Sequence, residues 1–95
     1  MEYNRYTILM KNLERIFKAV ANRRRLAILA FLKNKHEATV GQIAEAIKLS
    51  FTATSRHLSV LRSADLIEKD QRGLEVYYSL EASPARLVKN ILAEL

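Results

Sequence analysis

Residues 39–64 read TVGQIAEAIKLSFTATSRHLSVLRSA, and this stretch decides the fold. The TVGQ run at 39–42 fits a capping box, with Thr at the N-cap and Gln three residues later, so a helix begins there. Apolar residues at helical spacing give that helix one buried face. A tight turn at 48–50 ends it, and Ser50 then caps a second helix over 51–64.

The second helix has an inner stripe at i, i+3, i+7 and i+10 spacing and a polar outer face. The inner stripe consists of Phe51, Thr54, Leu58 and Leu61, and the outer face of Thr52, Ser55, Arg56, Ser59 and Arg62. Small hydroxyl residues and an arginine on a helix that follows a tight turn are typical of a helix that reads the major groove of duplex DNA. The pattern therefore predicts a helix-turn-helix.

A β-hairpin is predicted over residues 66–80. Residues 75–80 alternate between apolar and polar, the period of a half-buried strand, and 66–70 form the partner strand. The connection at 71–74 contains Gly73, which a tight hairpin needs at positive φ. We interpret the segment as a basic hairpin that suits an adjacent groove or the DNA backbone.

Helices flank this unit on both sides. The apolar spacing predicts one helix over about residues 4–21 and a second, capped by Asn22, over about 23–33, followed by a polar connector at 34–38. Ser83-Pro84 opens a last helix, with Ser as the N-cap and Pro at the first helical position. The expected fold is mainly α: one winged helix-turn-helix domain over residues 1–95, with about five helices and a two-stranded wing.

Charge and composition agree with a single DNA-binding domain. The 95 residues carry a net charge of +6, and residues 22–72 hold ten Lys or Arg against five Asp or Glu. This surplus coincides with the predicted DNA-binding unit, as a phosphate-binding surface requires. The alternative is a generally basic soluble protein. No apolar run approaches the length of a membrane span and no signal peptide is evident, so we expect a cytoplasmic protein with no membrane partner.

The sequence offers neither a metal site nor an enzyme site. It has no cysteine and only two histidines, His36 and His57, whereas a zinc site needs about four closely placed ligands. It contains no carboxylate pair and no glycine-rich phosphate loop. Ser55 and His57 are two residues apart on a helix and so face away from each other. We expect a binding protein without a cofactor, not an enzyme.

Several motifs resemble the ArsR-type winged-helix transcriptional repressors. The resemblance covers about residues 13–80. It is carried by Ser-Arg-His-Leu at 55–58 with Leu-Arg at 61–62, and by Arg-Gly at 72–73 with Val-Tyr-Tyr-Ser-Leu at 76–80. Further matches are Asn22, Arg25, Leu26, Ile28 and Leu29, then Ile43, Ala44, Leu49 and Ser50, and Leu66-Ile67. The resemblance implies a homodimer that binds operator DNA and represses transcription.

The chain departs from that family in three ways. Many members sense metals through cysteine pairs on the third helix or through His and acidic ligands on the last helix, and this chain has neither set. Phe51 stands where the family often has a polar residue, which puts one base contact in question. Arg23 stands where proline is frequent, so three arginines meet a helix N-terminus against its dipole. Either a DNA phosphate offsets this repulsion, or the charges are solvated and Arg25 forms an intramolecular ion pair.

The expected DNA contacts lie on the helix-turn-helix and the wing. They are Gln42, Ser50, Thr52, Ser55, Arg56, His57, Ser59, Arg62, Lys69, Arg72 and Gly73. Arg56 comes first, because an arginine on a groove helix can hold guanine O6 and N7 with two hydrogen bonds. Ser50 and Gln42 have helix capping as an alternative role, and His57 could instead pack beside the wing.

The resemblance implies that the first and last helices form the dimer interface, and both carry apolar stripes. The interface residues would be Tyr6, Leu9, Leu13, Phe17, Leu87, Val88, Ile91, Leu92 and Leu95. Packing of these stripes within one subunit is the alternative. The expected partners are a second copy of the chain and a pseudo-palindromic duplex with half-sites about one helical turn apart. The alternative function is a winged helix that binds protein without specific DNA readout.

Overall fold

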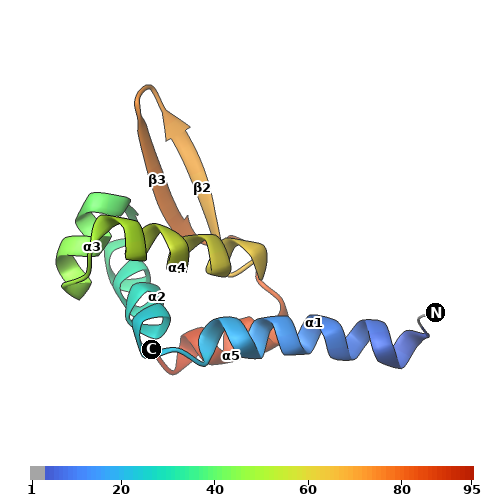
Figure 1. Ribbon diagram of the computed structural model, residues 1–95. Helices are drawn as coiled ribbons and strands as arrows, with labels where there is room; N and C mark the ends of the chain where they lie inside the picture. Colours follow the sequence, from blue (N-terminus) through green and yellow to red (C-terminus); the bar gives the residue numbers. More distant parts are fainter. Residues whose placement is uncertain (1–3) are drawn as a thin grey trace.

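The computed structural model describes residues 4–95 (Figure 1). In chain order the elements are α1 (Arg5–Val20), α2 (Arg23–Lys35), β1 (Glu37–Thr39), α3 (Val40–Ile47), α4 (Phe51–Ser63), β2 (Ile67–Arg72), β3 (Glu75–Leu80) and α5 (Arg86–Ala93). The predicted helix-turn-helix is α3 and α4, and the predicted wing is β2 and β3. None of the helices in this part of the chain is long and apolar enough to cross a membrane.

Side-chain caps begin the three central helices where the sequence predicts. The Asn22 amide oxygen accepts from the backbone N–H of Arg25 at 3.1 Å and so caps α2. Thr39 and Gln42 form the predicted capping box of α3, with hydrogen bonds of 3.3 and 2.9 Å between the side chain of each and the backbone N–H of the other. Ser50 caps α4. Each cap satisfies backbone donors that have no partner within the helix.

The last helix begins two residues later than predicted. Its N-cap is Ala85, which makes no capping hydrogen bond, so Ser83 and Pro84 precede the helix. The backbone N–H of Glu81 still donates to the Leu66 carbonyl at 3.0 Å beside the sheet. The chain therefore needs the following residues to turn away from the sheet before α5 can start.

A third strand, β1, was not predicted. It lies where the sequence indicated a polar connector, and it pairs antiparallel with β3, so the strand order is β1-β3-β2. His36 ends α2 at a φ of 76° and turns the chain into this strand. Ala38 is completely buried. Three residues are too few to show the alternation by which a strand is recognised.

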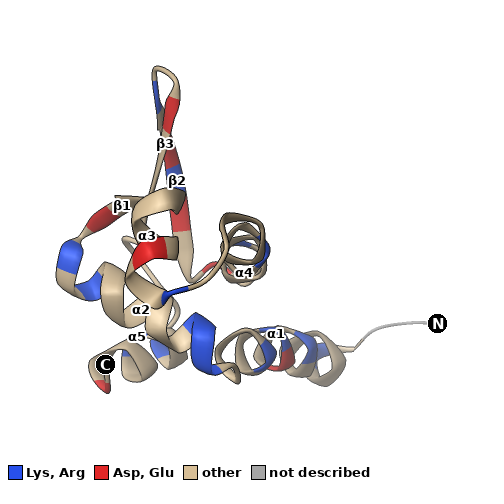
Figure 2. Ribbon diagram, turned by 60° about the vertical axis from the view of Figure 1, so that its left-hand side comes forward, with Lys and Arg blue, Asp and Glu red and all other residues tan. Residues whose placement is uncertain are grey.

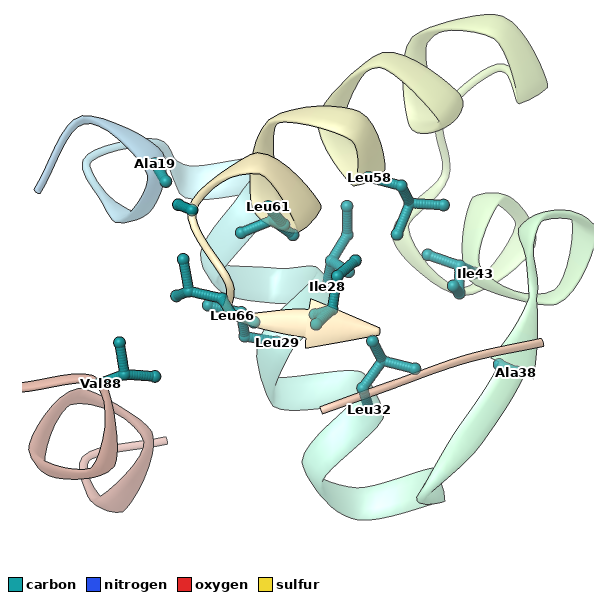
Figure 3. Packing of buried hydrophobic residues seen from close by; sticks show 12 residues of the cluster. Ala19, Ile28, Leu29, Leu32, Ala38, Ile43, Leu58, Leu61, Leu66 and Val88 are labelled. Carbon is teal, nitrogen blue, oxygen red and sulfur yellow. The ribbon is translucent and has the colours of Figure 1, made fainter. Parts of the chain in front are cut away.

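The core lies between α2, α4 and the base of the sheet. Figure 3 shows Ile28 and Leu29 of α2 near Leu61 of α4, and Val88 of α5 on the side of Leu66. The largest fully buried side chains are Ile28, Leu29, Leu32, Ile43, Leu58, Leu61, Leu66, Val88 and Thr54. Val88, which the sequence analysis assigned to the dimer interface, is 1% exposed and belongs to the core of its own subunit.

Phe51 does not belong to the buried stripe of α4, contrary to the prediction. Thr54, Leu58 and Leu61 are buried, but Phe51 is 61% exposed. At 3.6 residues per turn, residue 51 lies roughly 50° from the centre of the stripe that the other three define. The stripe also contains an unsatisfied group, because the Thr54 hydroxyl is buried without a hydrogen-bond partner among the described residues.

Arg25 joins α1, α2 and α4. Its Nε donates to the Ala19 carbonyl at 2.6 Å and its Nη2 to the Lys18 carbonyl at 3.0 Å, both at the end of α1. Its Nη1 lies 3.2 Å from Nδ1 of His57 on α4. An arginine has only donors, so His57 Nδ1 is the acceptor and the imidazole is neutral, with its proton on Nε2. Arg25 is therefore held by carbonyls and an imidazole, and among residues 4–95 it does not form the ion pair considered for it.

Burial, and next the positive charges of Arg25 and Arg24, lower the pKa of His57 below its ordinary value of 6.5. The unfolded chain consequently takes up this proton at a higher pH than the folded protein does. The stability that the neutral imidazole contributes is fully present above the ordinary pKa, and it is lost as the pH falls through the folded-state pKa.

We expect the free energy of unfolding to fall on acidification from about pH 7.5 to about pH 5.5, and to fall less in the His57→Gln variant. The glutamine oxygen can accept the hydrogen bond from Arg25 but cannot be protonated in this range. Urea denaturation at a series of pH values measures the difference. Parallel profiles for the two proteins would show that His57 does not titrate against Arg25.

Candidate nucleic-acid interface

The wing and α4 lie on one side of the molecule, and α1 and α5 lie together on the opposite side (Figure 1). The wing projects beyond α4 and away from α1 and α5. This arrangement leaves the outer face of α4 and the wing tip open to the same long partner. The side that carries α1 and α5 faces away from that partner and can make a different contact.

The outer face of α4 is open to solvent, as the sequence predicts. Thr52, Arg56, Ser59 and Arg62 are exposed and Ser55 is half-buried. Within the described part of the chain, the Arg56 guanidinium has no hydrogen bond or ion pair. Its donors are therefore available to an external acceptor such as a guanine edge or a phosphate.

Three other predicted contacts already serve the fold. Gln42 and Ser50 cap α3 and α4 with their side-chain oxygens. His57 accepts a hydrogen bond from Arg25, so its free donor is the Nε2 proton. If these three side chains contact DNA, they must do so with polar atoms that are not already used in helix capping or in the hydrogen bond from Arg25.

The wing carries more acidic than basic residues, so the interpretation of a basic hairpin is wrong. Glu68, Asp70 and Glu75 outnumber Lys69 and Arg72. Figure 2 shows both red and blue segments along the wing. The charge surplus counted from the sequence over residues 22–72 therefore comes from elsewhere.

Within residues 22–72, the basic residues outside the wing are the three arginines at 23–25, Lys33 and Lys35 at the end of α2, Lys48, and Arg56 and Arg62 on α4. Together with Lys18 in the last turn of α1, the three arginines that begin α2 form a basic corner, and Figure 2 shows a blue segment at the start of α2. Arg23 is exposed, and the Arg24 Nη1 donates to the Ile47 carbonyl of α3 at 3.4 Å. Because Arg25 contacts His57 of α4, this basic corner lies beside the DNA-reading helix. It is a suitable contact for the DNA backbone.

Arg72 is bound to acidic residues of the sheet. Its two terminal nitrogens donate to both carboxylate oxygens of Glu37 in β1, at 2.8 and 2.7 Å, and its Nε donates to Asp70 at 2.9 Å. The guanidinium lies 4.6 Å from the ring centre of Tyr77, whose hydroxyl donates to Glu75 at 2.6 Å. The hydrogen bond from Arg72 lowers the pKa of Glu37. A DNA phosphate that contacts Arg72 must therefore replace Glu37 or use the two N–H groups of the terminal nitrogens that these hydrogen bonds leave over.

The turn of the wing is shorter than predicted. Arg72 pairs with Glu75, which leaves only Gly73 and Leu74 as the loop. Gly73 has a φ of 64°, and a glycine at the first position is what a tight type II′ hairpin requires. Leu74 is fully exposed at the tip.

The described residues contain no cluster of three or more His, Asp or Glu residues that could hold a metal ion. The site is therefore assigned from its shape, its hydrogen-bonding groups and its charge. These are an exposed helix with hydroxyl and guanidinium groups, an adjacent hairpin and a basic corner, which together fit duplex DNA.

Comparisons with known proteins agree with this assignment. The model of the arsR family of bacterial regulatory proteins matches residues 22–69. The chain is 34% identical over 80 residues to the transcriptional activator HlyU of Vibrio cholerae, an alignment that covers 84% of this chain and 73% of HlyU. It is 37% identical over 68 residues to the transcriptional repressor SdpR of Bacillus subtilis, covering 72% and 74% of the two chains.

Solved structures confirm the predicted winged helix-turn-helix. The homodimeric DNA-binding domain of a possible ArsR-family regulator from Mycobacterium bovis superposes with a TM-score of 0.82 at 32% identity, covering 98% of this chain and 82% of that one. NolR from Sinorhizobium fredii superposes with a TM-score of 0.78 at 32% identity, covering 99% and 91%. The chain therefore belongs to the ArsR family of bacterial regulatory proteins and is a DNA-binding transcriptional regulator with a winged helix-turn-helix fold.

Proposed function

We propose that the protein is a homodimeric repressor that binds a pseudo-palindromic operator with one α4 helix from each subunit. The observation that carries this proposal is the solvent-exposed outer face of α4, where Arg56 has no partner within the described residues. Repression needs only that the dimer occupies its operator. The protein would therefore act by binding alone, without catalysis, in the bacterial cytoplasm where the operator lies.

The proposed DNA contacts fall into two groups. Base edges would be read from α4 by Thr52, Ser55, Arg56 and Ser59, because the first turns of a recognition helix enter the groove. Phosphates would be bound by Arg62, Lys69 and the exposed Arg23, with Gln42, Ser50, His57, Arg72 and the backbone of Gly73 as further proposed contacts. The phosphate contacts position the protein, and the base contacts specify the sequence.

Replacing Arg56 by Ala should weaken operator binding by about 1 to 3 kcal/mol, with little effect on binding to random duplex, if the guanidinium reads a base. Arg86→Ala is the matched control, because Arg86 is an exposed arginine on α5, on the other side of the molecule. Fluorescence titration with operator and random DNA at one fixed salt concentration separates the two effects. Equal losses of operator affinity in the two variants would show that Arg56 does not read a base.

We place the dimer interface chiefly on α1. Tyr6 is 75%, Leu9 49% and Phe17 52% exposed, and these apolar side chains share one face of the helix with exposed Met10. A contiguous apolar surface of this kind marks a protein contact. Leu13, Leu87 and Ile91 are half-buried, Leu95 is partly exposed, and Leu92 already packs against the core of its own subunit. The edge of α5 would therefore complete an interface centred on α1.

The Leu9→Glu variant should sediment as a monomer, because a charge in an apolar interface loses its hydration without gaining a partner. Leu74→Glu is the control, since Leu74 is an even more exposed leucine that lies on the wing. Sedimentation velocity at several protein concentrations distinguishes the two. A Leu9→Glu protein that remains dimeric would place the interface elsewhere.

Replacing Glu37 by Gln should tighten binding to random duplex and steepen its salt dependence by up to about 0.9 in log K against log salt concentration. The change removes the carboxylate that binds both terminal nitrogens of Arg72, so these nitrogens become available to a phosphate while Nε stays paired with Asp70. The control is the same substitution in an Arg72→Ala background, where the slope should not change. An identical slope increase in both backgrounds would mean that Glu37 acts only through its own charge.

A further inference from the structure

Phe51 is an exposed aromatic residue at the start of the DNA-reading helix. It is the first residue of α4 and precedes the exposed Thr52 directly, and Ser55 lies one turn further on the same face. Phe51 as a whole residue is 61% exposed. Phe51, Leu74 and Val76 line an open groove of about 370 Å³ between the wing, the start of α3 and the first residue of α4, so the wing does not cover the ring.

A phenyl ring in this place can recognise only one feature of a base pair. The ring has no hydrogen-bonding group, and residues in the first turn of a recognition helix meet base edges in the major groove. The single apolar group on those edges is the C5-methyl of thymine. Cytosine has only a hydrogen at C5, so it would leave the ring without this apolar contact.

We propose that Phe51 selects thymine at one position of each operator half-site by packing its ring on the thymine methyl group. This inference rests on the proposed operator binding through α4 and names one of its base contacts. The proposal also places a thymine base against the exposed ring, next to the base edges that the neighbouring Thr52 and Ser55 would contact. A protein partner on this face would exclude the DNA that those residues bind.

The test uses the full-length protein and an operator obtained by selection from a random DNA library. Each thymine of a half-site is replaced in turn by deoxyuridine, which lacks only the methyl group, and the dissociation constant is measured at fixed salt. One replacement per half-site should weaken binding of the unchanged protein by about threefold to fivefold, the worth of one buried methyl group. The Phe51→Ala protein should bind the thymine operator more weakly and be insensitive to that replacement.

Leu74→Ala is the matched control, because it removes a more exposed apolar side chain on the other side of the groove. It should keep the sensitivity to deoxyuridine. Circular dichroism checks that Phe51→Ala keeps its fold, as the exposure of residue 51 predicts. If the selected operator binds but every deoxyuridine replacement affects Phe51→Ala and the unchanged protein equally, the thymine contact is wrong and operator binding stands. A protein that selects no duplex contradicts both proposals.

Discussion

The guanidinium of Arg25 is the contact on which the geometry of the reading surface depends. The last carbonyls of a helix have no partner within it, and Arg25 supplies donors to two of them at the end of α1. The same planar group donates to His57 of α4. Because the guanidinium is a rigid fork, these hydrogen bonds fix the orientation of α1 relative to α4. In a dimer formed through α1, that orientation would decide how far apart the two α4 helices stand, and so which half-site spacing the dimer fits.

Positive and negative charges are distributed unevenly between the helices and the wing, so these parts attract DNA phosphates to different degrees. Basic residues gather at the corner where α1 meets α2 and two more lie on the outer face of α4, whereas the wing has an acidic excess. Phosphates are therefore attracted towards the helix-turn-helix and its corner more strongly than towards the wing. The contact between Arg72 and Glu37 further reduces the positive charge that the wing offers in the free protein. In the proposed complex, the hairpin would contribute its shape, Lys69 and the wing tip to DNA binding.

Local signals predicted most of the fold, and contacts between distant segments account for what was missed. The caps at Asn22, Thr39 and Ser50 and the helical periodicity depend only on near neighbours, so they were predicted correctly. Strand β1 was missed because its pairing with β3 spans forty residues and its own three residues carry no pattern. The hydrogen bonds of Arg25 are equally non-local. The exposure of Phe51 depends on where the core ends beneath α4, which helical spacing does not reveal. The acidic excess of the wing can be counted in the sequence, but the charges were summed over residues 22–72, and that segment leaves out Glu75.

Thr39 is at once the last residue of β1 and the N-cap of α3. No loop separates the sheet from the helix-turn-helix, so the base of the wing and α3 must move as one rigid piece. The three rows of the sheet that include β1 end at Tyr77. Beyond that row only the pairs Gln71–Val76 and Arg72–Glu75 remain, as a two-stranded ribbon. The wing can therefore bend along the contour of a groove only at these two pairs, and there the contact of Arg72 with Glu37 of β1 resists the bending.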